Sequence, residues 1–385
     1  MAKDSTAKVE NKAEAKIWES LISEFGGNSM FRADEKARFS MEGVPLPSIA
    51  LGAACGTFEL PFGKIGLFYG AEGSGKSLTC LLAIKETQKK YPKTKCVLVD
   101  AEGSADRKWM AQLGIDLSRL MIVNSSDGVE IFSILCGVYN DKTGKKTKLG
   151  ILDRVIAGEL DVKLIVLDSI ANIQPPQEAG RSFSSNEISP LPKFLNRSLR
   201  FCRPMLAKAG AAMLTVNHLR IKMDGHGGTY FPGGNTLKHQ CDLIVKQHPS
   251  TKAEMQILDE HGNKQGHGLI CTCEKTRFGP NRHQAGFFLD FRFGVVRLGE
   301  ELATVAVAFG VVQHPTPQSS WVYGEHSVKG KEKFGQLLES DPKLFKEVFD
   351  KVKANKDAGV EGVLEVSDEA KEAAKDVEIL VDDEA

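Results

Sequence analysis

The sequence predicts an α/β fold with a mostly parallel, twisted sheet flanked by helices. Short apolar runs of strand type alternate with helical patterns from about residue 40 to residue 298, as is typical of parallel strands joined by crossover helices. The runs are almost continuously apolar, which is expected of strands buried on both faces. A glycine-rich segment lies between one apolar run and the helix that follows it, and this order is typical of the same architecture.

An N-terminal segment precedes this core. Residues 1–12 are polar, and residues 13–25 have a helical pattern that ends at Gly26 and Gly27. Four apolar side chains share one face of this predicted helix, namely Ile17, Leu21, Ile22 and Phe25. That face needs a partner, either the core of the same chain or a neighbouring subunit.

The core contains seven strand candidates, at residues 65–69, 96–100, 164–168, 212–216, 242–247, 269–275 and 286–292. Residues 78–90 form the helix after the first strand. Two further helical patterns, at 332–338 and 342–353, predict a small C-terminal domain. The chain therefore divides into an N-terminal helix with a linker (1–40), a core (41–298), a small α/β domain (299–356) and an acidic disordered tail (357–385).

Charge is unevenly spread along the sequence. Lys plus Arg and Asp plus Glu each number 50 in the chain of 385 residues, but residues 357–385 hold eleven acids and only two lysines. The rest of the chain is therefore basic. This division predicts either a polyanion-binding surface for which the tail competes, or a tail that only keeps the protein soluble.

Several classes of protein are disfavoured by composition. The eight cysteines include no C-x-x-C pair, so neither a zinc site nor a disulfide framework is expected. The N-terminus lacks an apolar signal segment, and the longest apolar stretch, residues 302–312, is too short to span a bilayer. We therefore expect a cytoplasmic protein that does not bind a membrane.

Residues 70–77 match the phosphate-binding pattern G-x-x-x-x-G-K-[ST]. The residues that would hold a nucleoside triphosphate are Gly70, Glu72, Gly73, Ser74, Gly75, Lys76, Ser77 and Leu78. Backbone N–H groups and the terminus of the following helix favour an anion here. Lys76 would reach the β- and γ-phosphates, and the Ser77 hydroxyl would coordinate Mg²⁺.

Hydrolysis would need further polar groups beside the phosphates. The apolar run 164–167 delivers Asp168 and then Ser169 to the same edge of the sheet, where a carboxylate would bind Mg²⁺. Glu102 lies just beyond another such strand and could polarise a water, although an acid at a helix N-terminus is an alternative reading. His218 ends a third apolar strand and would face the γ-phosphate.

Residues 224–234 contain five glycines, and we expect a mobile loop there. Within or beside it, Tyr230 and Phe231 could contact bases, while Arg220, Lys222 and Lys238 could contact phosphates. A flexible surface loop without a ligand is the alternative.

Taken in order, these motifs resemble the RecA recombinases. The resemblance runs over roughly residues 15–355 and includes the phosphate-binding loop, Asp100-Ala-Glu102, Leu167-Asp168-Ser169, Asn217-x-x-Arg220 and Gly233-Gly234-Asn235-x-Leu-Lys238. It implies a RecA-type core that binds ATP and Mg²⁺, with an N-terminal helix for oligomerisation. It also implies that Glu102 is the catalytic glutamate.

The resemblance assigns further roles by position. Asp106 and Trp109 would contact adenine, and Lys275 and Arg277 would reach the γ-phosphate of a neighbouring subunit. The residues implied to bind DNA are Arg181 in a first loop near 178–189, Lys193 and Arg200 on the next helix, and Gly233, Gly234, Asn235 and Lys238 at the exit of the second loop.

A protein of this kind would be a DNA-dependent ATPase that forms a helical filament on single-stranded DNA and catalyses strand exchange with double-stranded DNA. Single-strand-binding and mediator proteins are implied as further partners. Two alternatives remain, a ring-forming motor of helicase type and a nucleotide-dependent scaffold. The chain departs from bacterial members at His218, where Gln is usual, and at His239, where Phe is usual, which indicates a bacteriophage or otherwise divergent member.

Residues 140–160 are longer than is typical for the resemblance and rich in lysine. Either an extra DNA contact or a solvated charged insertion would account for them.

Overall fold

The computed structural model describes residues 12–25, 42–140, 142–176, 191–221, 229–230, 232, 234–279 and 283–359. Two units are distinguished, residues 1–41 and 42–385. In the first, the described element is α1 (Lys12–Phe25), which contains Ile17 and Trp18 with exposed side chains. The predicted helix at 13–25 is therefore present, and it begins one residue earlier, at Lys12.

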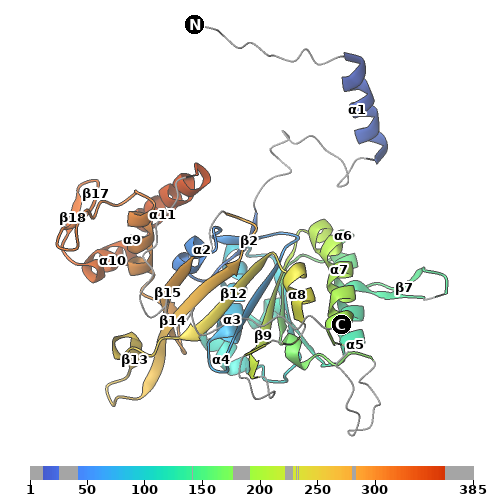
Figure 1. Cartoon of the computed structure of the whole chain (residues 1–385), viewed down its shortest axis with the longest axis horizontal. Coiled ribbons are helices and arrows are strands. Elements are labelled where there is room, and N and C mark those ends of the chain that lie inside the picture. The colour runs from blue at the N-terminus through green and yellow to red at the C-terminus, as the bar shows by residue number, and fades with distance from the viewer. Residues whose placement is uncertain are drawn as a thin grey trace. The chain divides into compact units, whose positions relative to one another are not determined.

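The second unit is built on one large sheet (Figure 1). Its strand order is β16 (Gly294–Val296), β15 (Gln284–Asp290), β14 (Lys264–Lys275), β12 (Leu243–Pro249), β3 (Ile65–Gly70), β9 (Ala212–His218), β8 (Val162–Asp168), β4 (Lys95–Asp100) and β5 (Leu120–Asn124). From β12 to β5 every neighbouring pair is parallel. Short β13 (Gln256–Leu258) pairs with β14.

One edge of the sheet departs from the predicted parallel arrangement. In the series β12, β14, β15 and β16, each strand runs antiparallel to its neighbour. Only residues 276–283 join β14 to β15, and only residues 291–293 join β15 to β16. Such connections are too short for a crossover helix, so each chain segment must return beside the one before it. Strands β5 and β16 were not predicted.

Helices cover both faces of the sheet. Successive side chains of each strand point to opposite sides, so apolar strands present an apolar surface on each face for helices to cover. On β3, Phe68 joins the core cluster that contains α3 (Lys76–Lys90). Its neighbours Leu67 and Tyr69 join the cluster on the other face. That second cluster contains residues of α5 (Gly128–Cys136), α6 (Ile151–Ile156), α7 (Leu191–Ala209) and α8 (Gly234–Gln240).

Shorter elements surround this framework. They are β1 (Gly43–Pro45), α2 (Ile49–Ala54), β2 (Glu59–Pro61), α4 (Arg107–Gln112), β6 (Val138–Tyr139), β7 (Lys146–Lys148), β10 (Arg220–Ile221) and β11 (Thr229–Tyr230). Strand β7 and helix α6 lie within the lysine-rich residues 140–160, and β6, which pairs with β7, directly precedes them.

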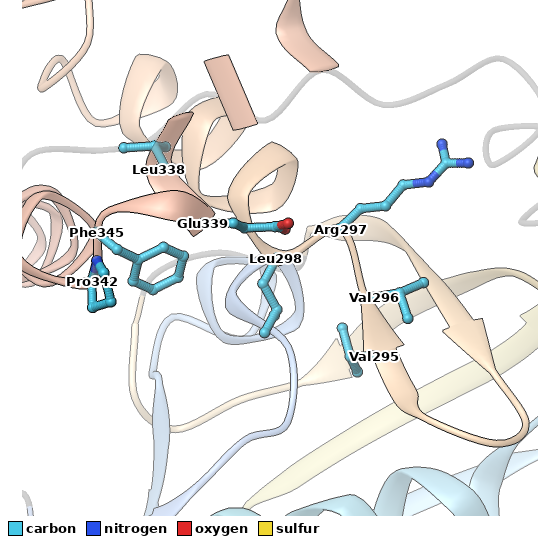
Figure 2. A pocket seen from close by; sticks show the side chains of 8 residues that line it. All are labelled: Val295, Val296, Arg297, Leu298, Leu338, Glu339, Pro342 and Phe345. Carbon is cyan, nitrogen blue, oxygen red and sulfur yellow. The ribbon is translucent and has the colours of Figure 1, made fainter. Parts of the chain in front are cut away.

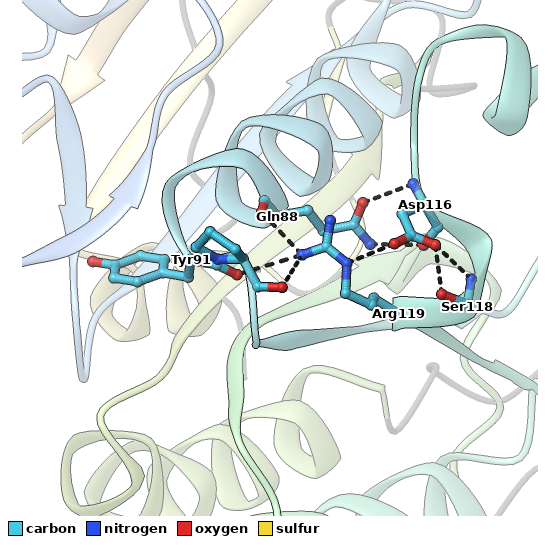
Figure 3. Close-up of polar contacts among 6 residues, drawn as sticks. Gln88, Tyr91, Asp116, Ser118 and Arg119 are labelled. Carbon is cyan, nitrogen blue, oxygen red and sulfur yellow. Dashed lines mark hydrogen bonds and ion pairs between the residues drawn. The ribbon is translucent and has the colours of Figure 1, made fainter.

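The helix that follows the phosphate-binding loop is anchored at its far end (Figure 3). Gln88 Nε2 donates to the Asp116 carbonyl, and Gln88 Oε1 accepts from the Asp116 N–H, both at 2.9 Å. Arg119 donates from Nη1 to the Gln88 and Pro92 carbonyls at 3.0 Å and from Nε to Asp116 at 2.7 Å. Hydrogen bonds from Ser118 and Arg119 hold the pKa of Asp116 at about 2. This network joins the end of α3 to the segment that leads into β5.

The C-terminal residues form a third apolar cluster around Phe334. It comprises α9 (Leu298–Ala308), β17 (Trp321–Tyr323), β18 (His326–Val328), α10 (Lys331–Ser340) and α11 (Pro342–Asp357), and α2 also contributes. A cavity of about 480 Å³ lies between residues 295–298 and the α10–α11 corner (Figure 2).

Candidate nucleotide-binding and catalytic site

The glycine-rich loop leaves β3 at Gly70 and enters α3 at Lys76. Gly75 caps the helix with φ 76°, a left-handed conformation that favours glycine. A Cβ there would also come within 2.9 Å of Leu289 Cδ2, so a larger residue would clash with the sheet. Ala71, Glu72 and Gly73 are exposed, which leaves the top of the loop open to a ligand.

Lys76 is folded into this loop. Its Nζ donates to the Ala71 carbonyl at 2.7 Å and to Ser74 Oγ at 3.3 Å. Burial lowers the pKa of Lys76, while the charges of Asp168, Glu102 and Glu72 act in the opposite direction. The loop's own acceptors therefore hold the Lys76 ammonium within the glycine-rich loop.

Asp168 lies at the end of β8, beside the start of α3. Burial raises the pKa of Asp168 to about 6, while a hydrogen bond from the Ser77 hydroxyl acts to lower it. The carboxylate's Oδ1 is buried and has no hydrogen-bond partner among the described residues. The arrangement suits a cation, because a hard metal ion would satisfy this oxygen and contact the Ser77 hydroxyl.

Glu102 lies beyond β4 and meets the tips of two other strands. Its Oε1 accepts a hydrogen bond from Ser169 Oγ at 2.7 Å and lies 2.8 Å from His218 Nε2. The structure therefore brings together three residues that the sequence analysis located on separate strands. Ser169 holds the carboxylate in place, and His218 connects it to the end of β9.

Asp106 and Trp109 are both engaged within the chain. The Asp106 carboxylate caps α4 by accepting from the backbone N–H groups of Lys108 at 2.8 Å and Trp109 at 3.2 Å. The indole Nε1 of Trp109 donates to the Phe291 carbonyl at 2.7 Å. These contacts give both residues a structural role in addition to the adenine contact implied by resemblance.

Arg277 and Lys275 lie at the opposite end of the sheet from the glycine-rich loop. Arg277 Nη1 donates to Oδ1 of Asp242 at 3.2 Å, and Asp242 Oδ2 accepts from the Ile65 backbone at 3.1 Å. Ile65 begins β3 and Gly70 ends it about 16 Å further along the strand, so Arg277 is held near the end of β3 that lies opposite the loop. Lys275 donates to the Lys238 carbonyl on α8, and burial lowers the pKa of Lys275.

Asp242 is a residue whose importance the sequence analysis missed. The carboxylate is fully buried, and Arg203 of α7 pairs with its Oδ2 while Arg277 binds its other oxygen. Only two signals for it were present in the sequence, an acid at the start of an apolar strand and an arginine one turn after Arg200 on the same helix.

Comparisons with known proteins now bear on this geometry. A model of the RecA N-terminal domain matches residues 12–266, well over half of the chain. The chain belongs to the RecA family.

Individual relatives of the RecA family cover most of the chain at low identity. Protein RecA of Aquifex aeolicus is 27% identical over 334 residues, which span 86% of this chain and 88% of that protein. Protein RecA of Fusobacterium nucleatum subsp. nucleatum is 28% identical over 332 residues, spanning 84% and 79%. A Dictyostelium discoideum protein named mitochondrial DNA repair protein recA homolog is 25% identical over 349 residues, spanning 88% and 70%.

Membership of the RecA family confirms the resemblance found in the sequence, and the α/β architecture with a mostly parallel central sheet is confirmed as well.

ATP and Mg²⁺ fit the residues present. Gly70 to Ser77 would hold the phosphates, and Ser77 and Asp168 would hold the metal, which would offset phosphate charge. Among the described residues there is no group of three or more His, Cys, Asp or Glu side chains that could hold a metal ion.

The residues that the sequence analysis connected with DNA are described only in part. Lys193 and Arg200 lie exposed on α7. Gly234 begins α8, which also carries Asn235 and Lys238, and Asn217 Nδ2 donates to the carbonyl of nearby Pro232 at 2.7 Å. Arg220 and Tyr230 are paired in the short β10–β11 ladder. Arg181, Lys222, Phe231 and Gly233 lie outside the described residues.

Two further expectations concern the ends of the chain and membranes. Most of the predicted acidic tail, from residue 360 onward, lies outside the described residues. Among the helices that the structure describes, none combines the length and apolarity needed to cross a membrane.

Proposed function

We propose that this chain is a DNA-dependent ATPase that assembles into a filament on single-stranded DNA and catalyses homologous pairing and strand exchange with double-stranded DNA in recombination and repair. Membership of the RecA family supports this proposal, as do relatives that are named RecA and, in one case, a DNA repair protein. We place the protein in the cytoplasm, with single-strand-binding and mediator proteins as further partners.

The separation between Arg277 and the phosphate-binding loop is the observation that carries the proposal. The pair Lys275 and Arg277 and the phosphate-binding loop are expected to act on one ATP. In a single chain, however, they lie near opposite ends of β3. A second copy of the chain can resolve this, because its Lys275 and Arg277 would complete the site formed by the first copy. An interface that joins two different surfaces repeats from copy to copy and generates a ring or an open helical filament.

Within such a site the described residues have distinct tasks. Lys76 would bind the phosphates, and Ser77 and Asp168 would hold Mg²⁺, which would offset phosphate charge. Glu102, oriented by Ser169, takes a proton from the attacking water, and the neighbouring copy's Arg277 stabilises charge on the transferring phosphoryl group. His218 responds to the γ-phosphate and transmits its loss toward the residues after β9, which include the predicted second DNA loop.

The four-part division of the chain belongs to the same proposal. Residues 1–40 would supply the oligomerisation helix, 41–298 the ATPase core with both DNA loops, 299–356 a small C-terminal domain and 357–385 the acidic tail. The exposed Ile17 and Trp18 of α1 give the first of these parts an apolar surface for a neighbouring copy.

The decisive experiment measures ATP hydrolysis with Mg²⁺, with and without single-stranded DNA, for the wild type and for a Lys275→Ala/Arg277→Ala variant. Strong stimulation by DNA that the variant loses is expected, and strand exchange is then assayed directly. Activity that is indifferent to both DNA and the substitutions would overturn the proposal. Electron microscopy of the DNA complex distinguishes the expected filaments from the rings of a helicase-type motor.

A further inference from the structure

The guanidinium of Arg277 is fixed by its own chain at one nitrogen. Its Nη1 donates to Oδ1 of Asp242 at 3.2 Å, and within the part of the chain that the structure describes Arg277 makes no other side-chain hydrogen bond or ion pair. A guanidinium carries five N–H donors, so Nε and Nη2 stay available to a ligand. Because 48% of the side chain is exposed, a ligand on a neighbouring molecule can reach these donors.

The backbone on both sides of Arg277 is fixed as well. The Thr276 hydroxyl donates to the Cys55 carbonyl at 2.7 Å and accepts from the Phe278 N–H at 3.2 Å. Cys55 is fully buried at the end of α2, so this anchor is part of the core. These contacts determine where the Arg277 side chain starts. An arginine side chain has many rotamers, however, so only a contact at the guanidinium determines where it ends.

The Asp242 carboxylate that provides this contact is itself held by two other elements. Its Oδ2 accepts from the Ile65 N–H of β3 at 3.1 Å and from Nη2 of Arg203 on α7. The same Arg203 nitrogen also donates to the Gln240 carbonyl of α8 at 2.7 Å. Because Asp242 is fully buried and its Oδ2 is bonded twice, Oδ1 is left at a fixed position beside Arg277.

Charge makes Asp242 necessary at this point. Lys275 donates to the Lys238 carbonyl, and burial lowers the pKa of Lys275, an effect that the charges of Arg277 and Arg203 increase and that of Asp242 opposes. Three cations therefore act on one another around a single carboxylate. Without that negative charge, their repulsion would drive the exposed Arg277 side chain away from the other two.

We propose that Asp242 positions Arg277 for the γ-phosphate of ATP on the neighbouring copy, and that Arg203 orients Asp242. This inference rests on the proposed function and names two residues on which the reaction depends although neither touches the nucleotide. A guanidinium that is held in place beforehand presents its donors to the phosphoryl oxygens without reorganisation. A misplacement of about 1 Å can lower a rate by about 10²-fold, so the contact to Asp242 matters for catalysis as well as for the fold.

The test places Asp242→Asn on one side of the shared site at a time. A mixture of full-length Lys76→Ala and Arg277→Ala is the reference, because each productive interface then takes its loop from one variant and its Arg277 from the other. Adding Asp242→Asn to the Lys76→Ala chain puts it in the copy that supplies Arg277. Adding it to the Arg277→Ala chain puts it in the copy that supplies only the loop. ATP hydrolysis with single-stranded DNA is measured for each mixture.

The two mixtures are expected to differ. With Asp242→Asn in the copy that supplies Arg277, kcat should fall about 10- to 100-fold below the reference while KM is unchanged, because the loop that binds ATP is intact. With Asp242→Asn in the other copy, the rate should equal the reference, because that copy's Arg277 is already removed. Asp350→Asn in the copy that supplies Arg277 is the matched control, because it removes an exposed carboxylate on α11, and the reference rate is expected.

The outcomes separate this inference from the proposed function. An equal loss in both mixtures would show that Asp242 acts only through the stability of the copy that carries it, and no loss in either would show that Arg277 needs no positioning. Either result overturns the inference and leaves the proposed function standing. If the reference mixture itself recovers no activity, the site is not shared and both fail. Circular dichroism identifies a variant that does not fold, in which case Arg203→Gln replaces Asp242→Asn, because it keeps the carboxylate and removes the donor that orients it.

Discussion

His218 Nε2 lies 2.8 Å from Oε1 of Glu102, although 116 residues separate them in the sequence. The same carboxylate oxygen accepts a hydrogen bond from Ser169 at 2.7 Å. Three parallel strands thus deliver their polar C-terminal residues to one point, as expected at the carboxyl edge of an α/β sheet. A change at the end of β9 that moves His218 would therefore also move Glu102.

Replacing Glu102 tests its role as the base. Glu102→Gln keeps an oxygen that can accept from Ser169, so the fold and nucleotide binding should be retained. ATP turnover should fall by about 10²- to 10⁴-fold, because an amide cannot take the proton from water. Steady-state phosphate release measures ATP turnover, and titration with a fluorescent ATP analogue measures nucleotide binding.

Glu86→Gln is the matched control for this substitution. Glu86 lies on α3, where its carboxylate pairs with exposed Lys89 across 3.7 Å. Turnover by this variant should equal that of the wild type. Comparable turnover by Glu102→Gln would remove Glu102 from the proposed mechanism.

The sequence allowed some parts of this site to be predicted and left others out of reach for a physical reason. Glu102, Asp168 and His218 each follow an apolar run. The carboxyl ends of parallel strands lie at one edge of the sheet, and this does not depend on the conformation of the loops. By contrast, the Arg203–Asp242–Arg277 cluster joins α7, β12 and the segment after β14, and no local pattern encodes which distant charges will meet. The Trp109 contact to Phe291 spans 182 residues and escaped prediction for the same reason.

The antiparallel edge shows a related limit. Apolar content predicted that residues 269–275 and 286–292 form strands, and they lie within β14 and β15 for most of their length. Direction depends on the connection instead, and the few residues between these strands leave no room for a crossover helix. Burial of the two strands is thus read from composition, whereas their orientation follows from loop length.

Asp242 should be important for stability because it is buried with charge on both sides. Asp242→Asn keeps an oxygen for the Ile65 N–H but removes the charge that Arg203 and Arg277 share. The free energy of unfolding should fall by about 1–3 kcal/mol, the range for disrupting a buried, charge-assisted hydrogen bond, with some relief because both arginines are partly exposed. Chemical denaturation followed by tryptophan fluorescence measures this change.

Asp350→Asn provides a comparison with an exposed ion pair. Asp350 pairs with Lys346 on the surface of α11, four residues away. Its loss should alter the unfolding free energy by less than about 0.5 kcal/mol. Equal effects of the two substitutions would contradict the structural role assigned to Asp242.

Glu301 should make stability depend on pH near neutrality. Its Oε2 accepts from Ser48 Oγ at 2.7 Å and the Ala50 N–H at 3.1 Å, yet burial raises the pKa of Glu301 to about 7 from its ordinary 4.5. The folded protein therefore binds this proton more tightly than the unfolded chain. Its stabilising contribution is complete below pH 4.5 and is lost as the pH rises to about 7, a difference of about 3 kcal/mol.

Glu301→Gln removes this titration and keeps a side-chain oxygen for Ser48 and Ala50. The measurement is the unfolding free energy of both proteins at intervals from pH 4.5 to pH 8. The difference between variant and wild type should shift in favour of the variant as the pH rises across this range. A difference that does not change with pH would show that the carboxyl group has the same pKa in the folded and unfolded states.

Mixing two inactive variants tests whether the ATPase site is shared between copies. Lys76→Ala lacks a working phosphate-binding loop but keeps Arg277, whereas Arg277→Ala has the reverse defect. Because Arg277 is held by Asp242 at the start of β3, far from its own loop, each variant alone should be inactive with DNA. In a random equal mixture, about a quarter of the interfaces would combine an intact loop with an intact arginine. DNA-stimulated hydrolysis should therefore recover to about one quarter of the wild-type rate, whereas a site completed within one chain would give no recovery, because neither variant could supply what the other lacks.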